Sequence, residues 1–233
     1  MFFGYFWGDW TLLIVLPAFF FALWAQFSVQ STYKKFGAVV TRHGITGATA
    51  AHLILQENGL SHIRIEQVRG HLTDHYDPRA GVIRLSDSVY DSKSVAAVGV
   101  AAHEAGHAIQ YATGYSAMRL RGAILPVCRI GSAAAMPLFL VGLLLANDAL
   151  MLFGIGAYSI VTLFQLLTLP VEFNASRRAM QAIETAELLS EDEQRGARKT
   201  LTAAAMTYVA ATAVALAQLL RLLLLVGGRR SDD

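Results

Sequence analysis

Long apolar runs alternate with two polar segments along this chain of 233 residues. Each run approaches the roughly 20 residues that an α-helix needs to cross about 30 Å of hydrocarbon. The third run has 23 residues without a charge. The pattern therefore predicts a mostly α-helical integral membrane protein with about four transmembrane helices, over residues 10–27, 123–146, 149–171 and 203–226.

The first and fourth runs are the less regular spans. The first has tryptophan near both ends, no Lys or Arg before it and no A-x-A site after it, which favours a retained anchor over a cleaved signal peptide. The fourth contains Gln218 and Arg221, which indicate either a polar contact inside the bundle or a helix that leaves the bilayer early. Whether these two runs cross completely is left open. The second and third runs are separated only by Asn147 and Asp148, which predicts a helical hairpin.

The polar segments have the patterns of a small α+β region. Within residues 28–122, a short helix is expected near 44–58, short strands and turns over 63–88, and a long Ala-rich helix over about 92–113. The segment 172–202 is expected to continue the third apolar helix, with a second helix starting at a capping box formed by Ser190 and Glu193. We treat the whole chain, residues 1–233, as one membrane domain.

Composition and charge narrow the class of protein. Charged residues make up 15% of the chain, against about 25% in soluble domains, so the lipid bilayer is an expected partner. A net charge of +2 argues against nucleic acid as a partner. The single cysteine, Cys128, cannot form an internal disulfide and is expected to pack as a small apolar residue.

The distribution of basic residues predicts the orientation in the membrane. Ten Lys or Arg lie between residues 28 and 122 and five between 172 and 202, whereas none precedes the first run or lies in the 147–148 turn. The positive-inside rule then places both polar segments in the cytoplasm and both termini outside, although Arg229 and Arg230 follow the fourth run. We expect a multi-pass protein of a bacterial inner membrane.

The candidate catalytic residues lie in the stretch AAHEAGHAIQ at residues 101–110, within the predicted long helix. His103 and His107 are four residues apart and therefore project from one helix face, where two imidazoles can bind one Zn²⁺. Glu104 is placed to act as the general base on a water molecule. The HExxH pattern also arises by chance, so a third ligand is needed to support the metal site.

The best third ligand is Glu172, the first charged residue after the third apolar run. It lies at the predicted cytoplasmic end of that run, on the same side of the membrane as His103. Simple solvation of a carboxylate at the interface is the alternative. No histidine follows His107 at the spacing of HExxHxxGxxH, so the metzincin pattern is absent.

Two long stretches, HYDPRAGVIRLSDSVYDSKSVAAVGVAAHEAGHAIQYATGY and LFQLLTLPVEFNASRRA, resemble the bacterial YugP-type membrane zinc metallopeptidases. The resemblance covers nearly the whole chain and implies one catalytic Zn²⁺ in a zincin-like cytoplasmic region. A more distant likeness is to the HtpX and Ste24 membrane peptidases, whose Glu ligand belongs to an E-x-x-x-D motif. Here Ser176 replaces that Asp, with Asn174 between, so these two are the candidates for orienting a ligand histidine.

The resemblance also implies where a peptide would bind and react. In this class the substrate usually lies along an edge strand above the active-site helix, and the stretch GVIRLS is the candidate, although a plain core strand fits its pattern nearly as well. Its residues are Val82, Ile83, Arg84 and Leu85. Polar residues near the motifs are candidates for stabilising an oxyanion, namely His71, His75, Tyr76 and Arg177.

The leading hypothesis is a zinc-dependent endopeptidase that hydrolyses membrane-associated or misfolded proteins. A non-catalytic zinc-binding membrane scaffold is the main alternative, but a structural site has no use for a base beside its ligands. A transporter is a third alternative, suggested by Gln218 and Arg221, but no paired charge or repeat supports it. The sequence gives no basis for an oligomeric state.

Overall fold

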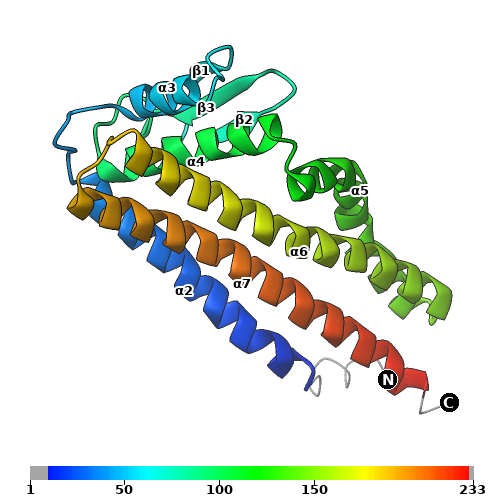
Figure 1. Ribbon diagram of the computed structural model, residues 1–233. Coiled ribbons are helices and arrows are strands. Elements are labelled where there is room, and N and C mark those ends of the chain that lie inside the picture. The colour runs from blue at the N-terminus through cyan, green and yellow to red at the C-terminus, as the bar shows by residue number, and fades with distance from the viewer. Residues whose placement is uncertain (1–9, 231–233) are drawn as a thin grey trace. The chain divides into compact units, whose positions relative to one another are not determined.

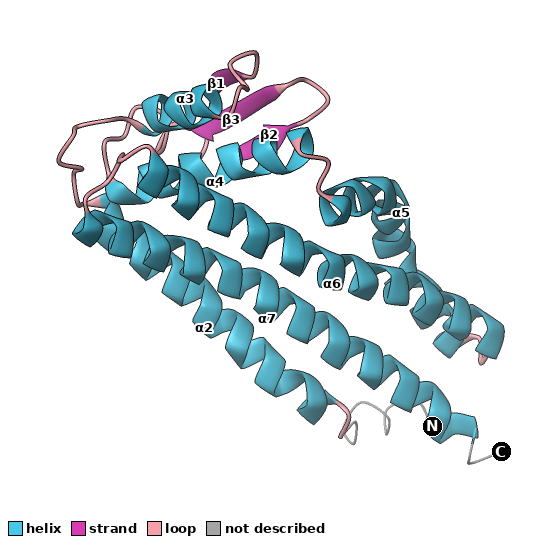
Figure 2. Cartoon of the chain, viewed as in Figure 1, coloured by secondary structure: helices cyan, strands magenta, loops and turns pink. Residues whose placement is uncertain are grey.

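The computed structural model describes residues 10–230 and is mostly helical (Figures 1 and 2). This confirms the predicted fold class, with four long apolar helices and a small three-stranded sheet. In chain order the elements are α2 (Leu12–Gly37), α3 (Gly47–Glu57), β1 (Arg64–Val68), β2 (His75–Asp77), β3 (Val82–Ser86), α4 (Val95–Ala112), α5 (Ser116–Leu144), α6 (Asp148–Thr185) and α7 (Glu191–Arg230).

The four candidate membrane spans are α2, α5, α6 and α7. They expose large apolar side chains that water would solvate poorly: Phe27 is 68% exposed, Ile130 74% and Phe153 70%. A lipid bilayer is the solvent that suits such surfaces.

Two of these helices are longer than a membrane requires. Helix α6 has 38 residues and α7 has 40, and at 1.5 Å per residue a helix of that size is nearly 60 Å long, about twice the hydrocarbon thickness. Pro170 lies inside α6 without ending it, so the third apolar run and the polar segment after it form one helix. Likewise, the helix that starts after Ser190 continues without a break into the fourth apolar run.

The described chain divides into two compact units. The first contains the residues up to Ala25, Leu120–Leu169 and residues 207–230, and its core joins α5, α6 and α7. The second contains Gln26–Arg119 and Pro170–Met206. All the sequence motifs with candidate chemistry fall in the second unit.

The core of the second unit forms where α3 and the sheet pack on α4. Four apolar side chains of this core are 0% exposed: Ile54 of α3, Ile83 and Leu85 of β3, and Val98 of α4. Burying each side chain of this size is worth about 1.5–3 kcal/mol. The alternating apolar residues of β3 thus anchor the sheet to the helix that carries the histidines.

The strand order is β1-β3-β2, with β1 parallel and β2 antiparallel to β3. β3 is therefore the central strand, and its residues Val82, Ile83 and Arg84 are paired on both sides, while Leu85 is paired with β1. The expectation that this strand is an edge strand for a substrate is wrong, because both of its edges are occupied at Val82, Ile83 and Arg84. The alternative of a core strand is the correct one.

Candidate metal site

Helix α4 carries the HExxH motif and has defined ends. The hydroxyl of Ser94 accepts a hydrogen bond from Ala97 N at 3.2 Å, which caps the first turn. At the other end Gly114 has φ +66°, a conformation that favours glycine, and Tyr115 N donates to Gln110 O at 2.9 Å. These caps fix a helix of 18 residues whose two histidines lie one turn apart on the same face.

Helix α6 approaches this face very closely. A Cβ atom added at Gly106 would lie 2.6 Å from the carbonyl oxygen of Ala175, so only glycine allows the two backbones to pack as they do. Gly106 immediately precedes His107 and Ala175 follows Glu172 by three residues. The close contact therefore places the ligand candidates of both helices together.

His103, His107 and Glu172 converge on one point. Glu172 Oε2 lies 3.2 Å from His103 Nε2 and 3.6 Å from His107 Nε2. One ligand atom from each residue lies within 4.8 Å of the others. Two imidazole nitrogens and one carboxylate oxygen are a donor set that suits zinc, and three protein ligands leave a fourth position open for chemistry. The residues present therefore fit the metal that the motif implies.

The cluster is shielded from solvent. Glu172 is 2% exposed and His107 is 8% exposed, and a buried carboxylate requires a positive partner or a metal. Burial lowers the pKa of His107, but the hydrogen bond to Glu172 and the nearby carboxylates of Glu104 and Glu172 outweigh this effect, so its pKa lies above the ordinary value.

Glu104 is also buried, at 7% exposure. Among residues 10–230 its side chain has no hydrogen-bond or ion-pair partner, and it lies directly beside His103 on α4. A carboxylate in this position is available to accept a proton from a substrate water.

The back of each imidazole ring also has a partner. Ser176 Oγ lies 3.2 Å from His103 Nδ1, so the expected replacement for the missing Asp does contact a ligand histidine. For His107 the partner is Gln110, whose Oε1 lies 3.0 Å from Nδ1. Asn174 forms hydrogen bonds with Gln110 and Arg178, and among the described residues none with a histidine. Sequence reasoning missed Gln110, although its position three residues after His107 places it on the same helix face.

The four candidates for oxyanion stabilisation are scattered. His71 packs edge-on against Tyr33, with ring centroids 5.5 Å apart. His75 is exposed and its Nδ1 lies 2.8 Å from Thr73 O, and Arg177 is exposed on α6. In the described part of the chain, none of the four candidates forms a hydrogen bond or ion pair with the cluster.

Tyr76 and the exposed His75 both lie on β2, the strand that contacts α4, and Tyr76 is the less exposed of the two. Its ring lies 6.1 Å from that of Tyr111, which follows His107 by one helical turn. Burial raises the pKa of Tyr76, so its hydroxyl stays protonated near neutral pH and remains a hydrogen-bond donor.

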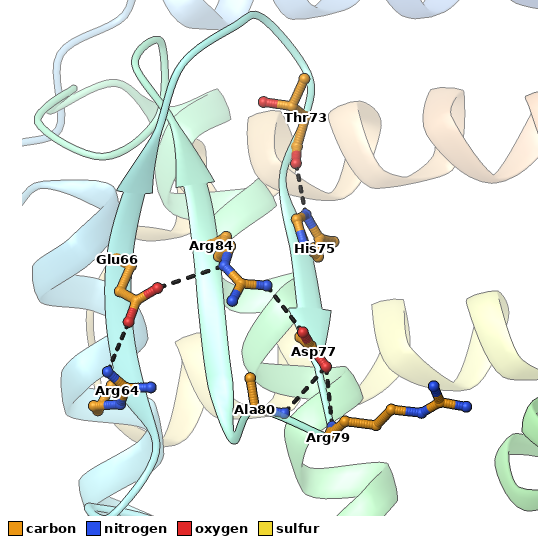
Figure 3. A network of polar contacts seen from close by, with 8 residues as sticks. All are labelled: Arg64, Glu66, Thr73, His75, Asp77, Arg79, Ala80 and Arg84. Carbon is orange, nitrogen blue, oxygen red and sulfur yellow. Dashed lines mark hydrogen bonds and ion pairs between the residues drawn. The ribbon is translucent and has the colours of Figure 1, made fainter.

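A polar network holds β2 to the rest of the sheet (Figure 3). The Arg84 guanidinium on the central strand lies 2.9 Å from Asp77 on β2 and 3.4 Å from Glu66 on β1. Asp77 Oδ1 also accepts hydrogen bonds from the backbone N–H groups of Arg79 and Ala80, which closes the turn into β3. β2 is the outer strand, with one edge paired to β3 and the other without a strand partner among residues 10–230.

Comparisons with known proteins point to a zinc-dependent class of enzyme. A family model described as "Putative neutral zinc metallopeptidase" matches residues 11–227. The chain is 45% identical over 222 residues to the "Putative membrane protease YugP" of Bacillus subtilis (strain 168). The aligned region covers 95% of this chain and 99% of that protein. No solved structure matches.

Proposed function

We propose a specific reaction for this chain, which belongs to the neutral zinc metallopeptidase family: endoproteolysis of membrane-associated or misfolded proteins at a single zinc site. Family membership agrees with the resemblance found in the sequence and makes the chain a membrane zinc metallopeptidase rather than a scaffold or a transporter. The observation that carries the proposal is the convergence of His103, His107 and Glu172 beside the buried carboxylate of Glu104.

In this proposal His103 Nε2, His107 Nε2 and one oxygen of Glu172 hold the metal. Zinc, when bound, polarises the scissile carbonyl and lowers the pKa of the attacking water. Glu104 accepts the proton of that water and then donates it to the leaving amine. Ser176 and Gln110 hold the two rings in place, and the burial of the cluster excludes competing water.

The unpaired edge of β2 is the proposed position of the substrate backbone. β2 is antiparallel to β3, contacts α4 and has no strand on its outer side among the described residues. A peptide in extended conformation can add to such an edge through main-chain hydrogen bonds. Tyr76, whose strand lies against the active-site helix, is the proposed donor to the oxyanion.

The proposed location is a bacterial inner membrane with the catalytic unit in the cytoplasm. Four candidate spans support a multi-pass protein, and the excess of basic residues in segments 28–122 and 172–202 supports a cytoplasmic position for both. Substrates are then proteins at or near the inner leaflet.

The test of the reaction is the substitution Glu104→Gln in the full-length protein in detergent. We expect one zinc ion per chain to remain bound, because Glu104 is not a ligand, while the rate of casein digestion falls by about 100-fold or more. Glu57→Gln, an exposed carboxylate on α3, is the matched control and should digest casein like the wild type. Unchanged digestion by Glu104→Gln would refute the mechanism.

A second variant tests the third ligand. Glu172→Ala removes the only carboxylate of the described residues that contacts both histidines, so zinc content measured after dialysis should fall well below one ion per chain. Full zinc occupancy in this variant would exclude Glu172 as a ligand.

A further inference from the structure

We infer that Gln110 is a positioning residue that fixes the proton of His107 on Nδ1 and so leaves Nε2 free for the metal. The inference deepens the proposed function, because it concerns the same ligand histidine. It rests on a chain of hydrogen bonds that runs from His107 on α4 through Gln110 and Asn174 to Arg178 on α6.

This chain of hydrogen bonds is continuous and largely buried. Gln110 Oε1 lies 3.0 Å from His107 Nδ1. Gln110 Nε2 donates to Val171 O at 2.8 Å and to Asn174 Oδ1 at 3.0 Å. Asn174 Oδ1 also accepts from Arg178 Nε at 2.9 Å. Gln110 is 0% exposed, so each of its polar atoms needs a partner inside the protein.

The donors and acceptors of this chain allow a single arrangement. A guanidinium group can only donate and a backbone carbonyl can only accept. Arg178 therefore requires the oxygen of Asn174 to face it, and Val171 O requires the amide nitrogen of Gln110. The oxygen of Gln110 is then left to face His107, and because an amide oxygen can only accept, Nδ1 must carry the proton.

A neutral imidazole with its proton on Nδ1 has its lone pair on Nε2. His107 Nε2 is the atom that lies toward Glu172 in the ligand cluster. The ring is thus set in the tautomer that binds metal before any ion arrives. His103 differs, because its partner is the hydroxyl of Ser176, which can donate or accept and does not fix the proton.

The chain also ties the two ligand-bearing helices together. Gln110 belongs to α4, and Val171, which accepts its hydrogen bond, is the residue immediately before Glu172 on α6. Gln110 therefore positions His107 and the backbone next to the third ligand at once. Partners of this kind typically change metal affinity by about 10- to 100-fold when they are removed.

The first test measures the zinc dissociation constant of the full-length protein by competition with a chelator. Gln110→Ala removes the acceptor that faces His107 Nδ1 without removing a ligand, and we expect zinc binding to weaken by about tenfold. Asn174→Asp keeps an acceptor for both donors and should stay within about threefold of the wild type. Gln181→Ala, an exposed amide on α6, is the control and should not change the constant.

Wild-type affinity in Gln110→Ala, or equal losses in Gln110→Ala and Asn174→Asp, would overturn the inference.

The second test reads the tautomer directly in zinc-free protein with ¹⁵N-labelled histidine at pH 8.5. Two-bond ¹⁵N–¹H correlations should show His107 with its proton on Nδ1, and the signal is assigned by its absence in His107→Gln. In Gln110→Ala the ring should show a mixture of tautomers, because the acceptor facing Nδ1 is gone. A proton on Nε2 in the wild type would refute the inference even if zinc binds and casein is cleaved, whereas loss of zinc binding in the wild type would refute the proposed function alone.

Discussion

Gly106 lies between the two histidine candidates and has a packing role that its neighbours in HEAGH do not suggest. In Gly106→Ala the new Cβ would lie 2.6 Å from Ala175 O. Because this oxygen belongs to the backbone of α6, the contact can be relieved only by moving the helix. We expect α4 and α6 to separate, with a loss of about 1–3 kcal/mol of stability. Zinc affinity should fall as well, because Glu172 moves with α6.

The measurement is thermal unfolding in detergent together with chelator competition. Gly156→Ala is the control, since nothing lies within 4 Å of a Cβ added there, and in a helix interior alanine is favoured over glycine by about 1 kcal/mol. If Gly106→Ala unfolds at the same temperature as Gly156→Ala and binds zinc with the same affinity, this account is contradicted.

At the level of single residues, the sequence is informative where chemistry is local. The i, i+4 spacing of His103 and His107 already defines a shared helix face. The assignment of Glu172 as a ligand candidate depended on the order of the apolar runs along the chain, because Glu172 is 65 residues from His107. Gln110 could not be assigned, since its role depends on Val171 O and Asn174, which only tertiary packing brings to it.

Among the elements, the start of α7 depends on Glu193. Its carboxylate accepts hydrogen bonds from Ser190 N at 2.8 Å and from Arg42 N at 2.7 Å. The predicted capping box is thus half formed, because Ser190 Oγ is buried without a hydrogen-bond partner among the described residues. Glu193 instead links the helix start to the loop before α3.

We therefore expect Glu193→Ala to lower the free energy of unfolding by about 1–2 kcal/mol, since it leaves two backbone N–H groups without their acceptor. Thermal unfolding followed by circular dichroism measures the loss. Glu191→Ala, at an exposed position in the same first turn, should change stability by no more than about 0.5 kcal/mol. Equal effects of the two substitutions would show that the hydrogen bonds to Ser190 and Arg42 contribute nothing.

The hairpin of β2 and β3 should respond to acid through Asp77. The hydrogen bond from Arg84 holds the pKa of Asp77 below its ordinary value. A carboxylate with a lowered folded-state pKa stabilises the fold fully above its unfolded pKa of about 3.9, and the contribution is lost as the pH falls through the folded value. Wild type should therefore exceed Asp77→Asn in stability at pH 7, and the two should converge as the pH falls through the lowered pKa of Asp77 in the folded protein.

Denaturant unfolding of both proteins from pH 7 down to about pH 2 provides the comparison. Asp87→Asn is a control carboxylate outside this network, on the segment that follows β3. A difference between wild type and Asp77→Asn that grows on acidification would reverse the expected sign and refute the role of the Arg84 pair.

The strands show why element patterns alone do not give topology. The alternation in GVIRLS predicted a strand correctly, but whether that strand is central or at an edge depends on which partners pair with it. β1 and β2 are short and polar, with exposed and half-exposed residues. Their pairing to the two sides of β3 follows from the buried face that β3 offers to α4, which is not visible in the local sequence.

For the whole molecule, the apolar runs were sufficient to predict four long helices, because the bilayer imposes length and hydrophobicity on each. The helix ends were less predictable. α6 and α7 continue far beyond their apolar runs, since nothing in the polar sequence breaks the helix there. This continuity places Glu172 on the same helix as the third span.

The orientation of the chain is the prediction that belongs to this largest scale. The basic residues of segments 28–122 and 172–202 should hold both in the cytoplasm, which leaves the turn before Ala149 outside. Single cysteines at Ala149 and at Glu57 on α3, both exposed positions, report the two sides. The native Cys128 is buried and should give little background.

An impermeant maleimide should label Ala149→Cys in intact spheroplasts and Glu57→Cys only after lysis. The reason is that moving α3 and the ten basic residues of its segment across the membrane opposes the charge bias that sets topology. Labelling of Glu57→Cys in intact spheroplasts would place the zinc site outside the cytoplasm. The substrates would then be external proteins, while the metal ligands and the base would keep their roles.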